Sequence, residues 1–151
     1  MFQALLTSLL EETTARSLRL ASPELALTAG IVLMLLVRIA GLDRRLPAHW
    51  VALAGSMTAF GLSLWMFADA NASVDVTVHY FSGLMAFDRF AAFVRLFLLL
   101  FLVFVIALTV LSGIPDREDG PDFYTLLMGA SVGLLVMCGA NHLLMLFIGI
   151  E

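Results

Sequence analysis

The residue best placed to do chemistry is Glu151, a carboxylate that follows a long stretch without charge. Residues 123–150 contain no Asp, Glu, Lys or Arg. One helix over this stretch would be about 42 Å long, whereas the hydrocarbon core of a bilayer is about 30 Å thick. Gly139 and Asn141 favour a turn, because glycine suits a helix C-terminus and asparagine suits an N-cap. Counted from Asn141, Glu151 would lie about 15 Å deep, near the bilayer midplane.

A carboxylate at that depth is costly, and it therefore suggests a functional role. It can bind and release protons if a basic partner changes its charge state. We predict that Glu151 transfers protons, with Asn141 and His142 as accessory polar residues at the other end of the same helix. His142 and Glu151 are nine residues apart and lie near opposite helix faces, so they do not form a direct pair. If residues 123–150 instead form one tilted helix, Glu151 is an ordinary interfacial charge.

The composition indicates an integral membrane protein. Apolar residues make up 62% of the chain and the mean hydropathy is +1.02, far outside the range of soluble domains. The net charge is −4 and there is no basic tail, which excludes nucleic acid as a partner and leaves the lipid bilayer as the environment. The sequence holds no phosphate-binding glycine motif, metal-ligand cluster or nucleophile with a base. We therefore predict no catalytic centre, cofactor site or metal site in this chain.

The hydropathy pattern predicts an all-α fold: a polytopic transmembrane helical bundle with four full spans and the start of a fifth. Ser22 is predicted to cap the first span, Gly41 to end it, and Asp88 to cap the third. Alternating residues over 74–79 and a turn at Ser82-Gly83 predict a short β-hairpin in the second loop. The predicted segments are an amphipathic N-terminal segment (1–21), spans at 22–40, 47–68, 88–113 and 122–139, an external loop at 69–87, and the start of a fifth span at 141–151.

The spans also carry signals for packing and orientation. Trp50 and Trp65 lie near the two ends of the second span, as an aromatic belt would place them. Arg95, in the third span, is expected to extend towards the outer headgroups. The loop after the first span is rich in Arg, which places that loop in the cytoplasm and the N-terminus outside. The second span has a small-residue surface suited to close helix contacts, made by Gly55, Ser56, Gly61 and Ser63.

Two stretches near the end of the chain follow a recognisable pattern. Asp122-Phe123-Tyr124 fits (D/E)-(F/Y)-Y, and residues 140–151, ANHLLMLFIGIE, fit A-N-(H/D)-L-L-x-L-F-(L/I)-G-(L/I)-E. Pro23-Glu24-Leu25 and Phe87-Asp88-Arg89-Phe90 fit weaker features of the same family. On these motifs the chain, from about residue 22 to its end, resembles subunit N of the proton-pumping NADH-quinone oxidoreductases, respiratory complex I.

The resemblance implies a role for Glu151. The matching glutamate of the family lies in the fifth transmembrane helix and works with a lysine on the seventh helix as a proton-transfer pair. The resemblance also implies a multi-pass protein of the cell inner membrane, with the other membrane subunits of complex I as partners. NADH and quinone would be handled by other subunits of the complex. Because a complete subunit has many more helices, we expect this chain to be truncated.

The function that we favour is that of a membrane subunit which takes part in proton translocation, while other subunits oxidise NADH and reduce quinone. One alternative is an antiporter-like subunit of a multi-subunit cation/proton antiporter or of a membrane hydrogenase, since those subunits share the glutamate. A second alternative is a helical membrane scaffold protein without a transport role. An open reading frame downstream that supplies further spans and an intramembrane lysine would exclude the scaffold.

Overall fold

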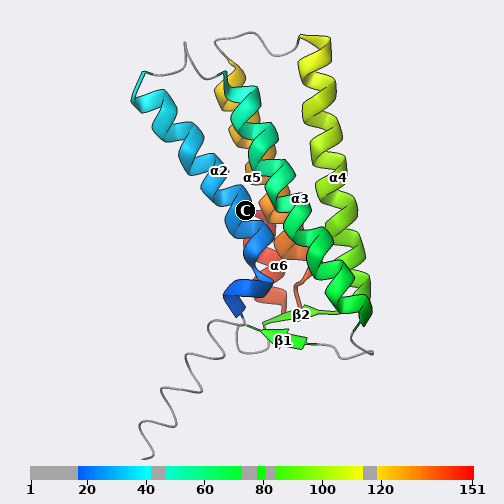
Figure 1. Cartoon of the computed structure of the whole chain (residues 1–151). Helices are drawn as coiled ribbons and strands as arrows, with labels where there is room; N and C mark the ends of the chain where they lie inside the picture. The colour runs from blue at the N-terminus through cyan, green and yellow to red at the C-terminus, as the bar shows by residue number, and fades with distance from the viewer. Residues whose placement is uncertain (1–16, 42–46, 73–77, 81–83, 114–118) are drawn as a thin grey trace, which may run out of the picture.

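A computed structural model describes residues 17–41, 47–72, 78–80, 84–113 and 119–151 of the chain (Figure 1). Four long helices form a bundle, and each is long and apolar enough to cross a membrane. A short fifth helix follows them, so the predicted all-α bundle of four spans and the start of a fifth is confirmed. The elements are α2 (Ser22–Ile39), α3 (Ala48–Ala72), β1 (Val78–Tyr80), β2 (Met85–Phe87), α4 (Arg89–Ser112), α5 (Gly120–Cys138) and α6 (Leu143–Ile150).

The two strands lie at one end of the bundle, which we call the hairpin end (Figure 1). They pair antiparallel, with Val78 opposite Phe87 and Tyr80 opposite Met85, as the predicted β-hairpin requires. The end opposite to it, where α2 and α4 finish, is called the loop end. The predicted hairpin turn, most of the amphipathic segment 1–21 and the Arg-rich loop lie outside the described residues.

The helix ends follow local sequence signals in two of three predicted cases. Gly41 adopts a φ of 67° after α2, a conformation that glycine accepts readily, and the Asp88 side chain accepts a 2.6 Å hydrogen bond from the Ala91 amide. The predicted cap at Ser22 is wrong, because Ser22 is already helical. Residues 17–20 are also helical and the Ala21 amide donates to the Ser17 carbonyl, so α2 continues from a preceding turn.

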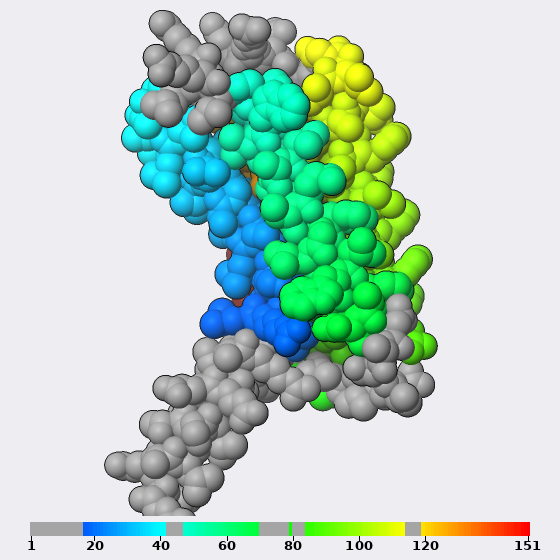
Figure 2. Space-filling view, viewed as in Figure 1, coloured from blue at the N-terminus to red at the C-terminus, as the bar shows by residue number. Residues whose placement is uncertain are grey.

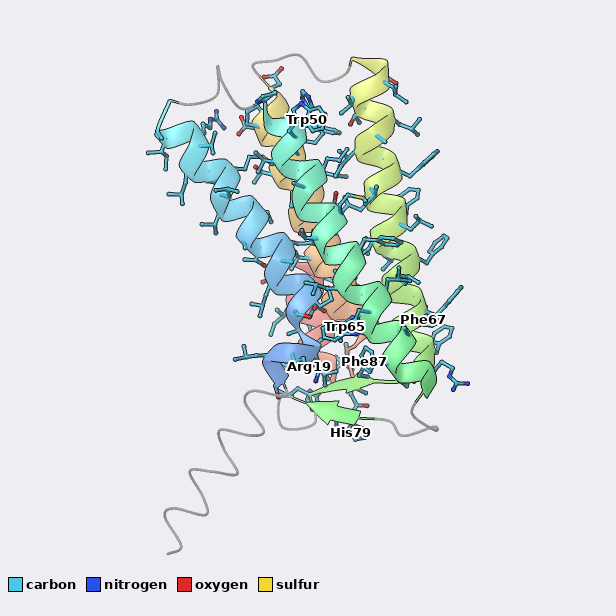
Figure 3. All side chains as sticks on the ribbon, viewed as in Figure 1. Arg19, Trp50, Trp65, Phe67, His79 and Phe87 are labelled. Carbon is cyan, nitrogen blue, oxygen red and sulfur yellow. The ribbon has the colours of Figure 1, made fainter. Side chains whose placement is uncertain are left out.

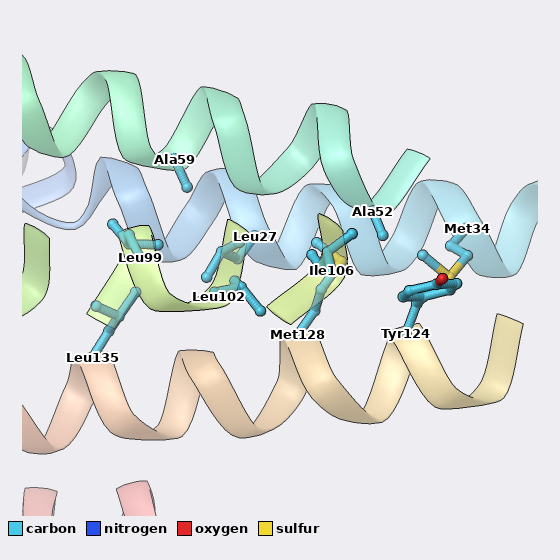
Figure 4. Packing of buried hydrophobic residues seen from close by; sticks show 10 residues of the cluster. All are labelled: Leu27, Met34, Ala52, Ala59, Leu99, Leu102, Ile106, Tyr124, Met128 and Leu135. Carbon is cyan, nitrogen blue, oxygen red and sulfur yellow. The ribbon is translucent and has the colours of Figure 1, made fainter. Parts of the chain in front are cut away.

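The four long helices share one apolar core (Figure 4). α2 and α3 pack closely at Gly30 and Gly55, where a Cβ built on Gly30 would lie 3.6 Å from the Gly55 Cα atom. The predicted small-residue contact is thus confirmed at Gly55. Gly61 was wrongly included, since a Cβ there meets no atom within 4 Å. Six residues turn the helix by about 240°, which points Gly61 away from the face of Gly55.

Apolar side chains also cover the outside of the bundle, as expected where lipid replaces water. Trp50 and Trp65 are 62% and 57% exposed and lie towards opposite ends of α3, in agreement with the predicted aromatic belt (Figure 3). Figure 2 shows the surface formed by α2, α3 and α4. α4 exposes a stripe of phenylalanines with helical spacing, made by Phe90, Phe93, Phe97, Phe101 and Phe104.

Candidate functional site

The charge-free stretch near the end of the chain is two helices with a turn between them, as predicted. α5 ends at Cys138, and the Gly139 amide donates to the Val136 carbonyl at 3.2 Å. The chain is extended at His142, whose Nδ1 accepts a 3.3 Å hydrogen bond from the Leu144 amide. The N-cap of α6 is therefore His142 and not the predicted Asn141.

The backbone of Asn141 pairs with the hairpin. Its amide donates to the Leu84 carbonyl at 3.0 Å, and the Ala86 amide donates to the Gly139 carbonyl at 2.9 Å. Between these two hydrogen bonds, Met85 of β2 stands opposite Ala140. The α5–α6 turn thus adds a third backbone segment to the hairpin, and α6 starts one residue later than the sequence predicts.

α6 runs back along α5 with the two backbones in direct contact. A Cβ built on Gly133 would lie 2.5 Å from the Gly149 carbonyl oxygen, and one built on Gly149 would lie 2.5 Å from the Met137 Cγ atom. These distances leave no room for a side chain at either glycine. The contact therefore limits, together with the turn, where α6 can lie along α5.

Glu151 follows the last turn of α6, and its amide donates to the Phe147 carbonyl at 3.2 Å. Its side chain is exposed, and the end of the chain lies about midway along the bundle (Figure 1). Asn141 and His142 lie at the hairpin end instead, separated from Glu151 by the roughly 12 Å length of α6. The structure does not bring the three predicted polar residues together. No ion pair to Glu151 occurs within the described part of the chain.

A second polar cluster, which the sequence analysis missed, lies inside the bundle near the hairpin end. Arg95 of α4 is 2% exposed and forms an ion pair with Glu24 of α2 through Nη2 and Oε1. Its Nη1 donates to the Leu20 carbonyl at 3.4 Å, and its guanidinium carbon lies 5.9 Å from the centroid of the Phe87 ring. The expectation that Arg95 extends to the headgroups is wrong.

The burial of Arg95 has a signal in the sequence. Its neighbours on the same face of α4 are apolar and buried, at spacings of three and four residues: Ala91, Leu99, Leu102 and Ile106. An arginine on such a face points into the bundle and needs a partner there. Glu24 lies in the first turn of α2, at the same end of the bundle, and supplies that partner.

Two further ion pairs link the helices at the surface. Arg19 and Asp69 approach to 3.5 Å at the hairpin end, and Arg38 pairs with Asp122 at the loop end. Both pairs are exposed. The described residues contain no group of three or more His, Cys, Asp or Glu side chains that could hold a metal ion.

Comparison with known proteins gives a consistent set of relatives, although no family model matches the chain. A protein named NADH-quinone oxidoreductase subunit N from Rhizobium meliloti is 27% identical over 140 residues, which cover 93% of this chain and 28% of the relative. Proteins with that name from Symbiobacterium thermophilum and Rhizorhabdus wittichii are 32% and 34% identical, over 87% and 89% of this chain. The chain spans about a quarter of the length of these relatives, at 26% and 27% for the last two.

Proposed function

We propose that this chain, which is homologous over about nine tenths of its length to the subunit N family of NADH-quinone oxidoreductases, is part of a membrane subunit that takes part in proton translocation. Other subunits of such a complex would oxidise NADH and reduce quinone. The three relatives named above are all called subunit N, which favours this function over that of an antiporter-like paralogue or a scaffold.

The break between α5 and α6 is the observation that carries the proposal. A single helix would have taken Glu151 to the far side of the membrane, where its charge would be solvated. The turn at Gly139–His142 reverses the chain instead, and the eight residues of α6 extend back by about 12 Å. With a hydrocarbon core of about 30 Å, this supports a position for Glu151 near the middle of the bilayer, where a carboxylate needs a functional reason.

Glu151 is proposed as the proton-transfer residue, and Asn141 and His142 as accessory polar residues at the start of its helix. A carboxylate that exchanges protons needs a basic group nearby, because a change in the charge of that group changes the proton affinity of the carboxylate. Arg95 is not this basic group, because its guanidinium already pairs with Glu24. The basic partner of Glu151 is therefore expected outside this chain, in the part of the relatives that the similarity does not cover.

We further propose that the protein spans the cell inner membrane with the hairpin end outside. The support is the Arg-rich connection between α2 and α3, where Arg38, Arg44 and Arg45 outnumber Asp43; acidic residues, as in the connection between α4 and α5, contribute little to orientation. The N-terminus then lies outside. Labelling of introduced cysteines tests this orientation, and the expected pattern is described below.

The test of the function is charge removal at Glu151 in the complete subunit within the assembled complex. Glu151→Gln keeps the shape and most hydrogen bonds but cannot ionise, so proton pumping should fall by roughly a hundredfold or more, the range typical for loss of a proton-transfer group. Glu151→Asp retains the carboxylate and should be milder. Pumping would be measured in closed vesicles beside NADH oxidation.

Asp69→Asn is the matched control, because it removes a carboxylate at the exposed surface of the hairpin end. It should leave pumping at the wild-type level. Wild-type pumping by the Gln variant in a fully assembled complex would contradict the proposal and reduce Glu151 to an interfacial charge.

A further inference from the structure

The ion pair between Glu24 and Arg95 differs in kind from a proton-exchanging site. A guanidinium does not lose its proton in a protein, so Arg95 remains a cation. Its partner, the Glu24 carboxylate, lies in direct contact with this cation inside the bundle. The pair is therefore a fixed charge arrangement, and its place in the fold indicates what it does.

Arg95 connects three segments that are far apart in the sequence. It pairs with Glu24 in α2, donates to the Leu20 carbonyl in the turn before α2, and lies over the ring of Phe87 at the end of β2. Figure 3 shows Phe87 at the hairpin end, near the turn before α2 that carries Arg19. The guanidinium thus holds the hairpin against the helices.

β2 connects the contacts of Arg95 to the start of α6. Two residues before Phe87, Met85 stands opposite Ala140, flanked by the hydrogen bonds from Ala86 to Gly139 and from Asn141 to Leu84. The next residue, His142, caps α6. Only β2 and the α5–α6 turn therefore separate the buried charge pair from the helix that carries Glu151.

Stability alone does not account for the pair. Glu24 Oε2 and Arg95 Nε have no hydrogen-bond partner among the described residues, so the pair is incompletely compensated for its loss of water. Replacing such a buried pair by apolar side chains is often neutral or stabilising. A pair of this kind is better explained by the specific geometry that it imposes.

We propose that Glu24 and Arg95 are positioning residues. The fixed ion pair holds Phe87 and β2, β2 holds the α5–α6 turn, and the turn sets where α6 begins and how deep Glu151 lies. The last step rests on the proposed function of Glu151, whereas the effect on the turn does not.

The first test measures the turn itself, by amide hydrogen exchange in the assembled complex. The variant is Glu24→Leu with Arg95→Met, which removes both charges and leaves neither one unpaired. Peptides that contain the amides of Ala86 and Asn141 should exchange roughly tenfold faster or more, because local opening becomes easier. The Gly41 amide, at the loop end, should exchange at the wild-type rate.

The matched control is Arg19→Gln with Asp69→Asn, which removes the exposed ion pair of the same end. It should leave exchange at Ala86 and Asn141 unchanged. Unchanged exchange in the Glu24→Leu/Arg95→Met variant would overturn the proposal, whatever role Glu151 has. Fast exchange together with wild-type pumping in that variant would overturn the link from the turn to Glu151.

The second test restores the contact between β2 and the turn without the ion pair. Met85 and Ala140 face each other as a non-hydrogen-bonded antiparallel pair, the type in which the two side chains lie closest. Cysteines introduced by Met85→Cys and Ala140→Cys should therefore form a disulfide. Cys138→Ala removes the native thiol of the chain. In the Glu24→Leu/Arg95→Met background, pumping should be low when the cysteines are reduced and should recover when they are oxidised.

A disulfide that forms fully but restores no pumping would show that the pair acts by another route, and would overturn the positioning role. The crosslink placed in the Glu151→Gln variant is the remaining control, and it should restore nothing. Because exchange reports on the turn and Glu151→Gln reports on the carboxylate, failure of this proposal is distinguishable from failure of the proposed function.

Discussion

At the hairpin end, Glu24 and Arg95 pair inside the bundle, with 10% and 2% of their side chains exposed; at the loop end, Arg38 and Asp122 pair with 45% and 59% exposed. Both contacts join α2 to another helix by the same chemistry. Water screens the loop-end pair and can replace either partner. Water cannot replace Arg95 in the same way, because removal of Arg95 would leave the Glu24 carboxylate buried without a counter-ion. The comparison teaches that the surroundings of an ion pair, more than its chemistry, decide how firmly it joins two helices.

The sharpest test of the comparison asks which end faces which side of the membrane. A cysteine placed at Asn71, at the hairpin end, should react with a membrane-impermeant reagent added from outside, and one placed at Gly41 should not. The background is Cys138→Ala, and the expected difference is all or none because the bilayer separates the two positions. The reverse labelling pattern would place the buried ion pair on the cytoplasmic side and overturn the proposed orientation.

The largest change in the free energy of unfolding is expected when only one partner of the buried ion pair is replaced. Arg95→Met leaves the Glu24 carboxylate without its cation, and it should lower the free energy of unfolding by about 3–5 kcal/mol. Denaturant titration of the purified protein in detergent measures the change. Glu24→Leu/Arg95→Met should recover most of the loss, and a single variant as stable as the double one would contradict this view of the pair.

The smallest effect is expected at the loop end. Asp122→Asn removes the charge that faces Arg38 at the surface, and it should change the free energy of unfolding by only about 0.2–1 kcal/mol. The same titration measures it, and the difference should shrink further when salt is added. A loss as large as that of Arg95→Met would mean that exposure does not distinguish the two ends.

Features set by neighbouring residues could be predicted from the sequence. The cap at Asp88, the positive φ at Gly41, the hairpin pairing and the break after Cys138 each depend on a few adjacent side chains, and all four are present. The four spans followed from hydropathy, because a lipid environment forces apolar helices.

Features set by distant residues could not be predicted in the same way. Asn141 is a good N-cap by type, but its backbone amide pairs with Leu84, far away in the sequence, and the N-cap of α6 is His142. Arg95 stood on a recognisable buried face, yet its partner comes from α2 and its further contacts from residues 20 and 87. Such pairings depend on how helices are arranged, which local signals do not specify.

The contact between Gly133 and Gly149 makes the height of Glu151 above the α5–α6 turn a discrete quantity. If α6 slid by one turn along α5, about 5.4 Å, Met145 would come opposite Gly133 in place of Gly149. Its side chain has no space there, since even a Cβ on Gly149 would collide with Met137. The two helices can therefore engage in one register or separate, and the final carboxylate has a single stable height above the turn.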